Sequence, residues 1–419
     1  MRILVGPTEI CGQINLFADG FRKLGHEVTT AVVNRNGNWW GATYDYDFTD
    51  RPFDLNRVLD VGYIFGSHDV FLYQWARDSF LPSLSDLSFL HAKGKKVISA
   101  FMGSDVRHYP TYAKWSGVMH DYIMNIPFSR EPVANALAPL RVAELLSSIV
   151  LSQPNQSVLG VRPYHHLFIP VDVSKLQFHI PRNPVPRLLH VPSRRGVKGT
   201  ELFLAACEEL QREGLLFELR LVENVTNAQV LEEMRDADIC LDELFAALHG
   251  KTAVEAMGSG CAVVSGDNFD LEPYPPERPL WCVRPWNLKE HLRELIINEN
   301  VRIALAERGW EYVQRYHDHV TVCKRMLDIL LAEDRSDKMH YPTLYTSGKY
   351  QLDESISAEI LCVTDALILK YGLPSGVSID ELIRIGRISP TARGHAHLVQ
   401  RWPDNEPSVW SSINPTALL

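Results

Sequence analysis

The sequence predicts an α/β protein with two doubly wound domains and a mostly helical C-terminal tail. A length of 419 residues suits two domains of ordinary size with material to spare. The chain opens with a buried strand at 3–5, a glycine-containing loop, a helix and a second strand at 28–33, which is how a doubly wound domain begins. A strand and a glycine-containing basic loop start the same pattern again near residue 188.

Composition limits the classes of partner. A hydrophobic content of 46% is ample for packed cores. The formal net charge of -9 and the isoelectric point near 6.0 argue against a nucleic-acid-binding protein. The longest basic cluster is Lys93, Lys95 and Lys96. We therefore expect no nucleic-acid partner.

Cysteine usage and the absence of long apolar runs bear on the cellular compartment of the protein. The seven cysteines are widely spaced, odd in number and never form a CxxC pair, which favours buried thiols in a reducing cytosol over disulfides or zinc sites. The opening run MRILVGPTE is too short for a signal peptide, and no segment approaches the roughly 20 apolar residues of a membrane span. The sequence predicts a cytoplasmic protein without a membrane span.

The stretch from 237 to 267 carries the clearest chemical pattern. A short apolar run at 239–241 suits a buried parallel strand and ends at Asp242 and Glu243. A second apolar run at 261–265 predicts the next buried strand. Polar groups are therefore expected at the carboxyl edge of a sheet, where parallel sheets bind ligands.

Between those strands lies a glycine followed by a predicted helix. Gly250, Lys251 and Thr252 precede the good helix formers of 253–257. A glycine before a helix leaves backbone N–H groups free to receive a phosphate. Glu255, about one turn further in, could accept hydrogen bonds from a ribose diol. This arrangement predicts half of a nucleotide site.

A basic loop lies at the start of the second domain. Ser193, Arg194, Arg195 and Lys198 come just before the predicted helix 201–213. Cationic side chains at the mouth of a helix act together with the free N–H groups and the helix dipole to bind an anion. The alternative is a solvated basic turn.

The central stretch is similar to the donor-sugar motif of retaining GT-B glycosyltransferases of family four. In that family a glutamate, seven residues and a second glutamate are followed by Ala-Met, a glycine and an apolar strand. Residues 255–257, Gly260 and the valines 263–264 match. The first glutamate does not, because its position is Ala247. A helix and strand of any α/β protein is the alternative interpretation.

A second stretch, residues 102–107, resembles the family's His-Gly-Ser-Asp-x-Arg sequence, with Met102 in the place of the histidine. Methionine neither accepts a proton nor carries charge, so this position has no acid/base role here. The acceptor-side candidates are Gly103, Ser104, Asp105, Arg107 and Trp75. An Asp/Arg pair that only braces the loop is the alternative for Asp105 and Arg107.

The resemblance also implies roles on the donor side. Lys198 and one or both of Arg194 and Arg195 would be the catalytic groups on the donor phosphates. The donor-binding candidates are Glu255, Gly250, Lys251, Thr252, Ser193, Gly12, Gln13, Glu223, Asp242 and Glu243. Gly12 and Gln13 would face the diphosphate from the first loop, although a bare glycine turn explains them equally well. Glu223 follows a strand where the family cradles the nucleobase.

The expected organisation follows the GT-B plan of two Rossmann-like domains facing across a cleft. Pro181, Pro184 and Pro186 mark a stiff linker. The predicted parts are an acceptor domain at 1–175, a donor domain at 188–315, a crossover helix at 316–334 and a C-terminal extension at 335–419. We expect two helices in 289–331. The extension could brace the cleft, form a homodimer or hold an acceptor.

Two kinds of sequence pattern resemble metal sites, but we do not predict metal binding at either. The DxD triplets 45–47 and 236–238 arise by chance at this Asp content. Residues 317–319, His-Asp-His, are expected on adjacent helix positions, which point to different faces. We expect no metal and no cofactor besides the nucleotide sugar, which is a co-substrate.

The function that the resemblance implies is transfer of a sugar from a nucleotide diphosphate donor, with retention and without metal. The acceptor would be a small molecule, a glycan or a lipid-linked compound. Asp242 or Glu243 is expected to replace part of the missing carboxylate at Ala247. The alternatives are an epimerase or hydrolase of sugar nucleotides, and a non-catalytic protein that binds them.

Overall fold

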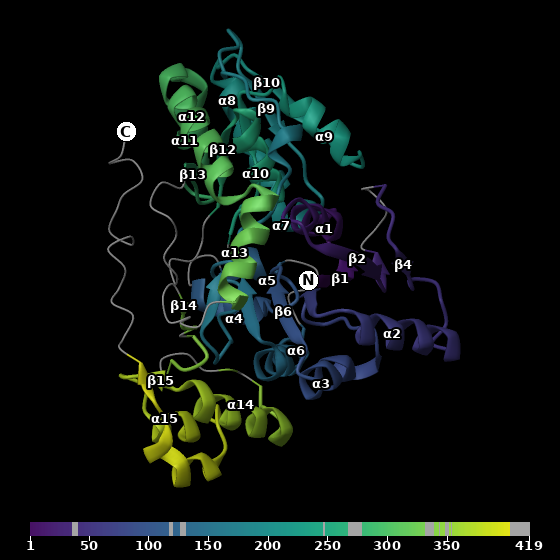
Figure 1. The fold of residues 1–419 in the computed structure, drawn as a ribbon. Helices are drawn as coiled ribbons and strands as arrows, with labels where there is room; N and C mark the ends of the chain where they lie inside the picture. The colour runs from purple at the N-terminus through teal and green to yellow at the C-terminus, as the bar shows by residue number, and fades with distance from the viewer. Residues whose placement is uncertain are drawn as a thin grey trace.

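The computed structural model contains two large sheets joined by a long helix, with a helical extension beside the first sheet (Figure 1). The described residues are 1–35, 41–116, 120–125, 131–245, 248–266, 279–331, 339–342, 344–347, 352 and 354–402. We call the larger sheet with its helices the N-terminal unit and the smaller one the C-terminal unit. No helix in these ranges is long and apolar enough to cross a membrane.

The sheet of the N-terminal unit has the order β14-β8-β7-β6-β5-β1-β2-β4, with β3 paired to β1. Its strands are β1 (Arg2–Glu9), β2 (Glu27–Val32), β3 (Asn34–Arg35), β4 (Tyr46–Asp47), β5 (Val70–Gln74), β6 (Lys96–Phe101), β7 (Ile149–Ser152), β8 (Tyr164–His166) and β14 (Met339–His340). Strand β5 is buried along its whole length, as expected for a parallel strand covered on both faces. The strands predicted at 3–5 and 28–33 are confirmed.

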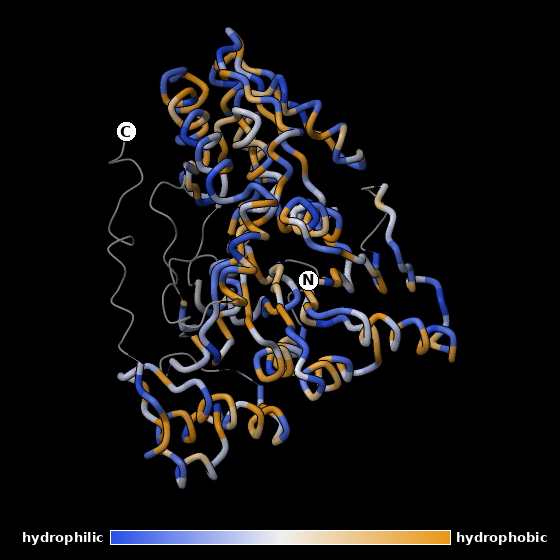
Figure 2. Tube along the Cα trace, in the orientation of Figure 1, coloured by the Kyte–Doolittle hydropathy of each residue, from blue (hydrophilic) through white to orange (hydrophobic). Residues whose placement is uncertain are grey.

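Helices cover this sheet. They are α1 (Gln13–Lys23), α2 (Leu55–Ser67), α3 (Ser85–Ala92), α4 (Tyr109–Ser116), α5 (His120–Met124) and α6 (Val133–Leu146), with the short 3-10 helices η1 (Pro82–Leu84) and η3 (Val173–Lys175). Helix α1 buries Ile14, Phe17 and Phe21, which recur at helical spacing along one face. Figure 2 shows the result as alternating apolar and polar segments along the covering helices.

The C-terminal unit has a fully parallel sheet of order β10-β9-β11-β12-β13. Its strands are β9 (Arg187–His190), β10 (Glu218–Leu221), β11 (Ile239–Leu241), β12 (Ala262–Ser265) and β13 (Leu280–Cys282). Helices α7 (Arg195–Lys198), α8 (Thr200–Arg212), α9 (Asn227–Met234) and α10 (Lys251–Ser259) connect them. The carboxyl ends of β9 and β11 are neighbours, so the loops after these two strands share one edge.

Residues 288–331 form three helices, so the prediction of two helices in 289–331 is wrong. They are α11 (Leu288–Ile297), α12 (Glu299–Tyr316) and α13 (His319–Leu331). Asn298 separates the first two because its side chain accepts a hydrogen bond from the Val301 N–H as the N-cap of α12. A second break falls at His317 and Asp318, which therefore do not continue a helix with His319 as the sequence suggested.

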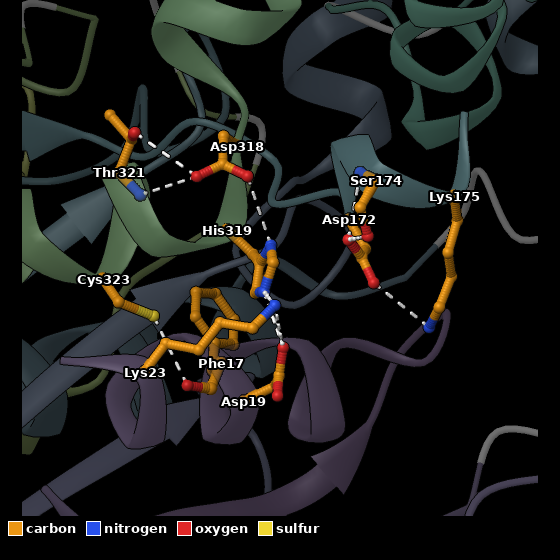
Figure 3. Close-up of polar contacts among 10 residues, drawn as sticks. All are labelled: Phe17, Asp19, Lys23, Asp172, Ser174, Lys175, Asp318, His319, Thr321 and Cys323. Atoms are coloured by element: carbon orange, nitrogen blue, oxygen red, sulfur yellow. Dashed lines mark hydrogen bonds and ion pairs between the residues drawn. The ribbon is translucent and has the colours of Figure 1, made fainter. Parts of the chain in front are cut away.

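The chain crosses from the C-terminal unit back to the N-terminal unit at this second break. The Val171 N–H donates to the His317 carbonyl at 2.9 Å, and the His319 N–H donates to the Val171 carbonyl at 3.0 Å. Figure 3 shows the side chains around it, where His319 Nε2 lies 2.7 Å from an Asp19 carboxylate oxygen of α1. The same carboxylate lies 2.8 Å from Lys23 Nζ. Helix α13 is thus fixed against α1.

The C-terminal extension is attached to the N-terminal unit. It contains α14 (Ala358–Tyr371), β15 (Leu373–Pro374), α15 (Ile379–Arg384), η4 (Pro390–Leu398) and β16 (Arg401–Trp402). Strand β14 pairs antiparallel with β8 and so completes an edge of the first sheet. The buried Arg141 guanidinium of α6 donates to Thr364 Oγ1 of α14 at 2.9 Å. The helical character of the extension is confirmed, whereas its strand in the first sheet was not predicted.

Candidate functional site

Lys198 ends the short helix α7 and lies beside two acidic residues that follow β11. Its ammonium nitrogen is 2.9 Å from Asp242 Oδ1 and 2.9 Å from Glu243 Oε2. The three residues are buried, with exposed fractions of 7% for Lys198, 1% for Asp242 and 7% for Glu243. We call them the donor-side cluster, after the role that the sequence predicts for them. The sequence placed them in two separate loops, and the adjacency of β9 and β11 brings these loops together.

Burial and charge act against each other in this cluster. Burial alone would lower the pKa of Lys198, but the charges of Asp242 and Glu243 outweigh it and raise that pKa above its usual value. Burial raises the pKa of Glu243, and the Lys198 charge only partly opposes the rise. Burial also lowers the pKa of His190, at the end of β9, to about 4. The cluster thus holds one fixed cation and two carboxylates.

The amino end of α10 lies against the same cluster. The Gly250 N–H donates to Asp242 Oδ2 at 2.8 Å, so this amide is not free as the sequence analysis expected. A Cβ atom at Gly250 would lie 3.2 Å from Lys198 Nζ, so the ammonium group lies close against the start of α10. Lys251 Nζ donates to the Cys11 carbonyl at 2.7 Å and so contacts the first loop of the N-terminal unit. Thr252 is the second residue of the helix.

Glu255 lies in α10 with an exposed fraction of 5%. Asn227 Nδ2, at the start of α9, is 3.1 Å from both of its carboxylate oxygens. Lys251 Nζ lies 3.3 Å from Oε1. These contacts from Asn227 and Lys251 hold the carboxylate in one orientation. Asn227 was not among the sequence candidates, although its position at a helix start after a strand is a signal that could have found it.

The two arginine candidates differ from Lys198. Arg194 and Ser193 are exposed residues ahead of α7, and Arg194 is its N-cap residue. Arg195 donates to Glu201 Oε1 at 2.9 Å and to Glu223 Oε2 at 2.8 Å. Of the three cations predicted for the donor phosphates, Lys198 is the buried one that lies beside α10.

The first loop of the N-terminal unit faces α10. Gly12 has a φ of 74°, in the left-handed region that glycine adopts without strain. The Gln13 N–H donates to Glu9 Oε1 at 2.9 Å, and Tyr44 donates to Glu9 Oε2 at 2.8 Å. Burial raises the pKa of Glu9, while Lys251 is among the groups that oppose the rise. The sequence analysis missed Glu9, even though it is a carboxylate at the end of a parallel strand.

The acceptor-side loop, residues 102–107, is held by its own backbone. Asp105 has no exposed surface, and its carboxylate accepts from the N–H groups of Met102, Gly103 and Ala76 at 3.1, 2.8 and 2.9 Å. These bonds support the bracing alternative for Asp105. Ser104 is half-buried at the turn of this loop.

Arg107 and Trp75 extend the same region. Arg107 donates to Gln156 Oε1 at 2.9 Å and to the Tyr109 hydroxyl at 2.8 Å, so it does not pair with Asp105 through any contact given for the described residues. The positive charge of Arg107 acts to lower the pKa of Glu243 in the C-terminal unit. Trp75 has a φ of 89°, and its half-buried ring packs with the core that contains Met102. A tryptophan in this conformation is uncommon.

A hollow of about 210 Å³ lies between the two units. Tyr122 and Asn125 line it from the N-terminal unit, whereas Arg195 and Phe245 line it from the C-terminal unit. The rings of Tyr122 and Phe245 are stacked, with centroids 5.6 Å apart and planes inclined by 20°. Aromatic side chains were not among the predicted site residues at these positions.

Aspartates of the two DxD triplets accept hydrogen bonds that hold the local structure together. Asp45 accepts from the Thr30 N–H at 2.8 Å, and Asp238 accepts from the Arg187 N–H at 2.8 Å. The described residues contain no group of three or more His, Cys, Asp or Glu that could hold a metal. Ala247, which stands in place of the family's first glutamate, lies outside the described residues.

Comparisons with known proteins address the architecture. No protein-family model and no curated protein matches the chain. Among solved structures, sucrose-phosphate synthase from Thermosynechococcus elongatus matches with a TM-score of 0.54 and 13% identity, covering 78% of this chain and 97% of that one. An α-glucosyltransferase in complex with UDP and a 13-mer DNA with an A:G mismatch matches with a TM-score of 0.51 and 11% identity, over 79% and 98%.

The chain has a GT-B fold. Sequence identities this low show that the architecture is shared and show nothing about activity or substrate. Within this GT-B fold, the donor-side cluster occupies the carboxyl edge of the second sheet. In the first sheet, Glu9 ends β1, Cys11 follows it, and the acceptor-side loop follows β6. The prediction of two Rossmann-like domains is confirmed by the two sheets with their covering helices.

Proposed function

We propose that this protein is a glycosyltransferase that moves a sugar from a nucleoside diphosphate donor to an acceptor, with retention and without metal. The observation that carries the proposal is the meeting of the buried Lys198 ammonium with the amino end of α10 at one sheet edge. A cation and a helix start in one place form a site for a diphosphate. The GT-B fold supports this assignment.

The proposed donor roles follow from position. As the donor's glycosidic bond breaks, negative charge grows on the β-phosphate, and groups placed there lower the barrier. Lys198 is such a group, and Arg194 or Arg195 would approach from the exposed loop beside it. The N–H groups of Lys251 and Thr252 would bind a phosphate oxygen. Glu255 would accept hydrogen bonds from the ribose, with Asn227 orienting its carboxylate.

The proposed acceptor binds against the N-terminal unit. Ser104, Arg107 and Trp75 are partly accessible candidates of this region, and the hollow lined by Tyr122 and Phe245 lies on the interface between the units. Small molecules, glycans and lipid-linked compounds all carry the hydroxyl that the reaction requires. Contact between the units at Lys251 and Cys11 would keep water away from the donor.

Calorimetry and product analysis test the proposal. UDP, GDP, TDP and ADP sugars are titrated into the protein, and any donor that binds is then incubated with and without cell extract as the acceptor source. We expect one nucleotide to bind tightly and sugar transfer to require the extract, with the anomeric configuration of the product read by NMR. Unchanged transfer after EDTA treatment is expected for a metal-independent enzyme. Absence of binding by all four nucleotides contradicts the proposal.

A non-catalytic nucleotide-sugar-binding protein is the second candidate. It is favoured by one observation, the pairing of Lys198 with two carboxylates that already neutralise its charge. In that case a donor binds but is consumed neither with extract nor without it. Consumption of donor in the absence of extract would instead indicate a hydrolase or an epimerase.

A further inference from the structure

The donor-side cluster contains one carboxylate more than its cation can neutralise. Lys198 carries one positive charge, while Asp242 and Glu243 each place an oxygen 2.9 Å from its nitrogen. With one positive and two negative side chains, the cluster has a net negative formal charge. A diphosphate is itself an anion, so it cannot approach Lys198 while both carboxylates stay ionised and in place.

The two carboxylates are bound differently. Asp242 also accepts the Gly250 N–H at 2.8 Å and lies 3.4 Å from the Ser265 hydroxyl, so its position is set by α10 and β12. For the Glu243 carboxylate, Lys198 is the hydrogen-bond partner that the structure gives. Glu243 has the longer side chain and is the one that can leave Lys198 without breaking the connection between strand and helix.

We propose that Glu243 is a proton-coupled gate on the donor site, which leaves Lys198 and takes up a proton when the diphosphate of a donor binds there. This proposal rests on the proposed function and assigns Glu243 a role in admitting the ligand. The proton comes from solvent and adds to a carboxylate oxygen of Glu243, so the cluster exchanges one carboxylate charge for the charges of the phosphates. No bond other than this O–H is made or broken.

Once Glu243 leaves Lys198, its surroundings favour a protonated carboxyl group over a new ion pair with another cation. Lys198 on α7, Asp242 on the adjoining residue and Arg107 of the acceptor-side loop are the charged groups that act on it. His190 at the end of β9 also faces the cluster, and its pKa of about 4 keeps it neutral near pH 7. Arg107 is already bonded to Gln156 and Tyr109. Burial raises the pKa of Glu243, which lowers the free-energy cost of proton uptake.

Calorimetry in buffers of different ionisation enthalpy tests the gate. UDP, GDP and inorganic pyrophosphate are titrated into the parent protein and into Glu243→Gln between pH 5.5 and 8. For the parent we expect proton uptake approaching one per ligand and an affinity that rises up to about tenfold for each pH unit lowered. Glu243→Gln is expected to bind more tightly than the parent at pH 8, with little proton uptake.

The matched control is Glu208→Gln, which changes an exposed carboxylate of α8 that pairs with Arg212. It should retain the proton uptake of the parent. A parent that binds diphosphates without taking up protons, or a Glu243→Gln variant with the parent's pH profile, overturns the gate and leaves the proposed function standing. If neither protein binds any of the three ligands, the gate is overturned, whereas the proposed function is judged by the titration of the four sugar nucleotides. Binding by Glu243→Gln alone at pH 8 supports the gate.

Discussion

The donor-side cluster and the acceptor-side loop both bury carboxylates at the carboxyl edge of a parallel sheet, but different groups satisfy them. In the cluster, one lysine side chain lies 2.9 Å from two carboxylates. In the loop, three backbone N–H groups hold Asp105. Backbone amides cannot change partner without a change of fold, whereas an ammonium group can. The comparison indicates that the loop is framework and that the cluster is where a ligand can compete.

The largest effect is expected from Lys198→Met. It removes the buried cation and should reduce kcat at saturating donor by about 10² to 10³, or about 3 to 4 kcal/mol of transition-state stabilisation. Steady-state kinetics measure the change, and a thermal melt checks that the variant is folded. Lys175→Met, at an exposed lysine, is the matched control. A kcat within threefold of the parent would contradict the role of Lys198.

Asp105→Asn tests the other half of the comparison. It places an amide against three N–H donors and should reduce the free energy of unfolding by about 3 kcal/mol, because buried donors lose a charged acceptor. Urea denaturation measures this loss. Asp69→Asn, which changes an exposed carboxylate, should cost less than about 1 kcal/mol. A folded Asp105→Asn of parental stability would show that the loop does not depend on this brace.

Glu255→Gln should weaken binding of a nucleoside diphosphate by about 2 kcal/mol, close to thirtyfold, with a smaller effect on kcat. The reason is that a hydrogen bond to a charged group is worth about 1.5 to 3 kcal/mol. Calorimetry gives the dissociation constant, and Glu208→Gln on the exposed face of α8 serves as the control. A loss confined to kcat would place Glu255 at the reacting bond instead.

The Gly20→Ala variant tests whether the contact between α1 and α13 is as rigid as the acceptor-side loop. An added Cβ would lie 2.7 Å from Cys323 Sγ and 2.7 Å from the His319 carbonyl oxygen. Overpacking of this kind should reduce the free energy of unfolding by about 2 kcal/mol. Gly62→Ala in α2 meets no atom within 4 Å and should be neutral or stabilising. Equal denaturation curves for the two variants would mean that α13 shifts freely on α1.

Stability should also depend on pH through His190, beneath the donor-side cluster. Its pKa of about 4 in the folded protein is below the ordinary value of 6.5, so the unfolded chain binds the extra proton. Stability is therefore full above about pH 6.5 and falls by about 1.4 kcal/mol per pH unit between 6.5 and 4 from this residue. His190→Gln should flatten that part of the profile in urea denaturation. A steeper profile would contradict the assignment.

Much of the framework could be predicted because its signals are local. The buried strands at 239–241 and 262–265 and the helix between them follow from apolar runs bounded by glycine and acidic residues. The separation of α11 from α12 depends on one N-cap, Asn298, within a continuous run of helix formers, so the pattern alone did not show it. Helix start signals from a single side chain are easily hidden in such a run.

The site was predictable in part. Residue types and predicted strand ends placed Lys198, Asp242 and Glu255 near a sheet edge. They did not show which charged groups pair with one another. The double ion pair on Lys198 depends on the strand order, which puts β11 next to β9. Asn227 and Glu9 were missed for the same reason, since Asn227 contacts Glu255 and Glu9 contacts Tyr44, partners that are distant in sequence. The bracing of Asp105 by Ala76 likewise needs β5 and β6 to be neighbours.

Strand β14 has a consequence for how the protein is made. The first sheet begins with residues that leave the ribosome early, yet its outer edge beside β8 is closed by Met339 and His340. Until synthesis passes this point, β8 presents unpaired backbone groups that other nascent chains could bind. The entire second sheet is translated in that interval. Premature termination between α13 and β14 would therefore release a product prone to aggregation.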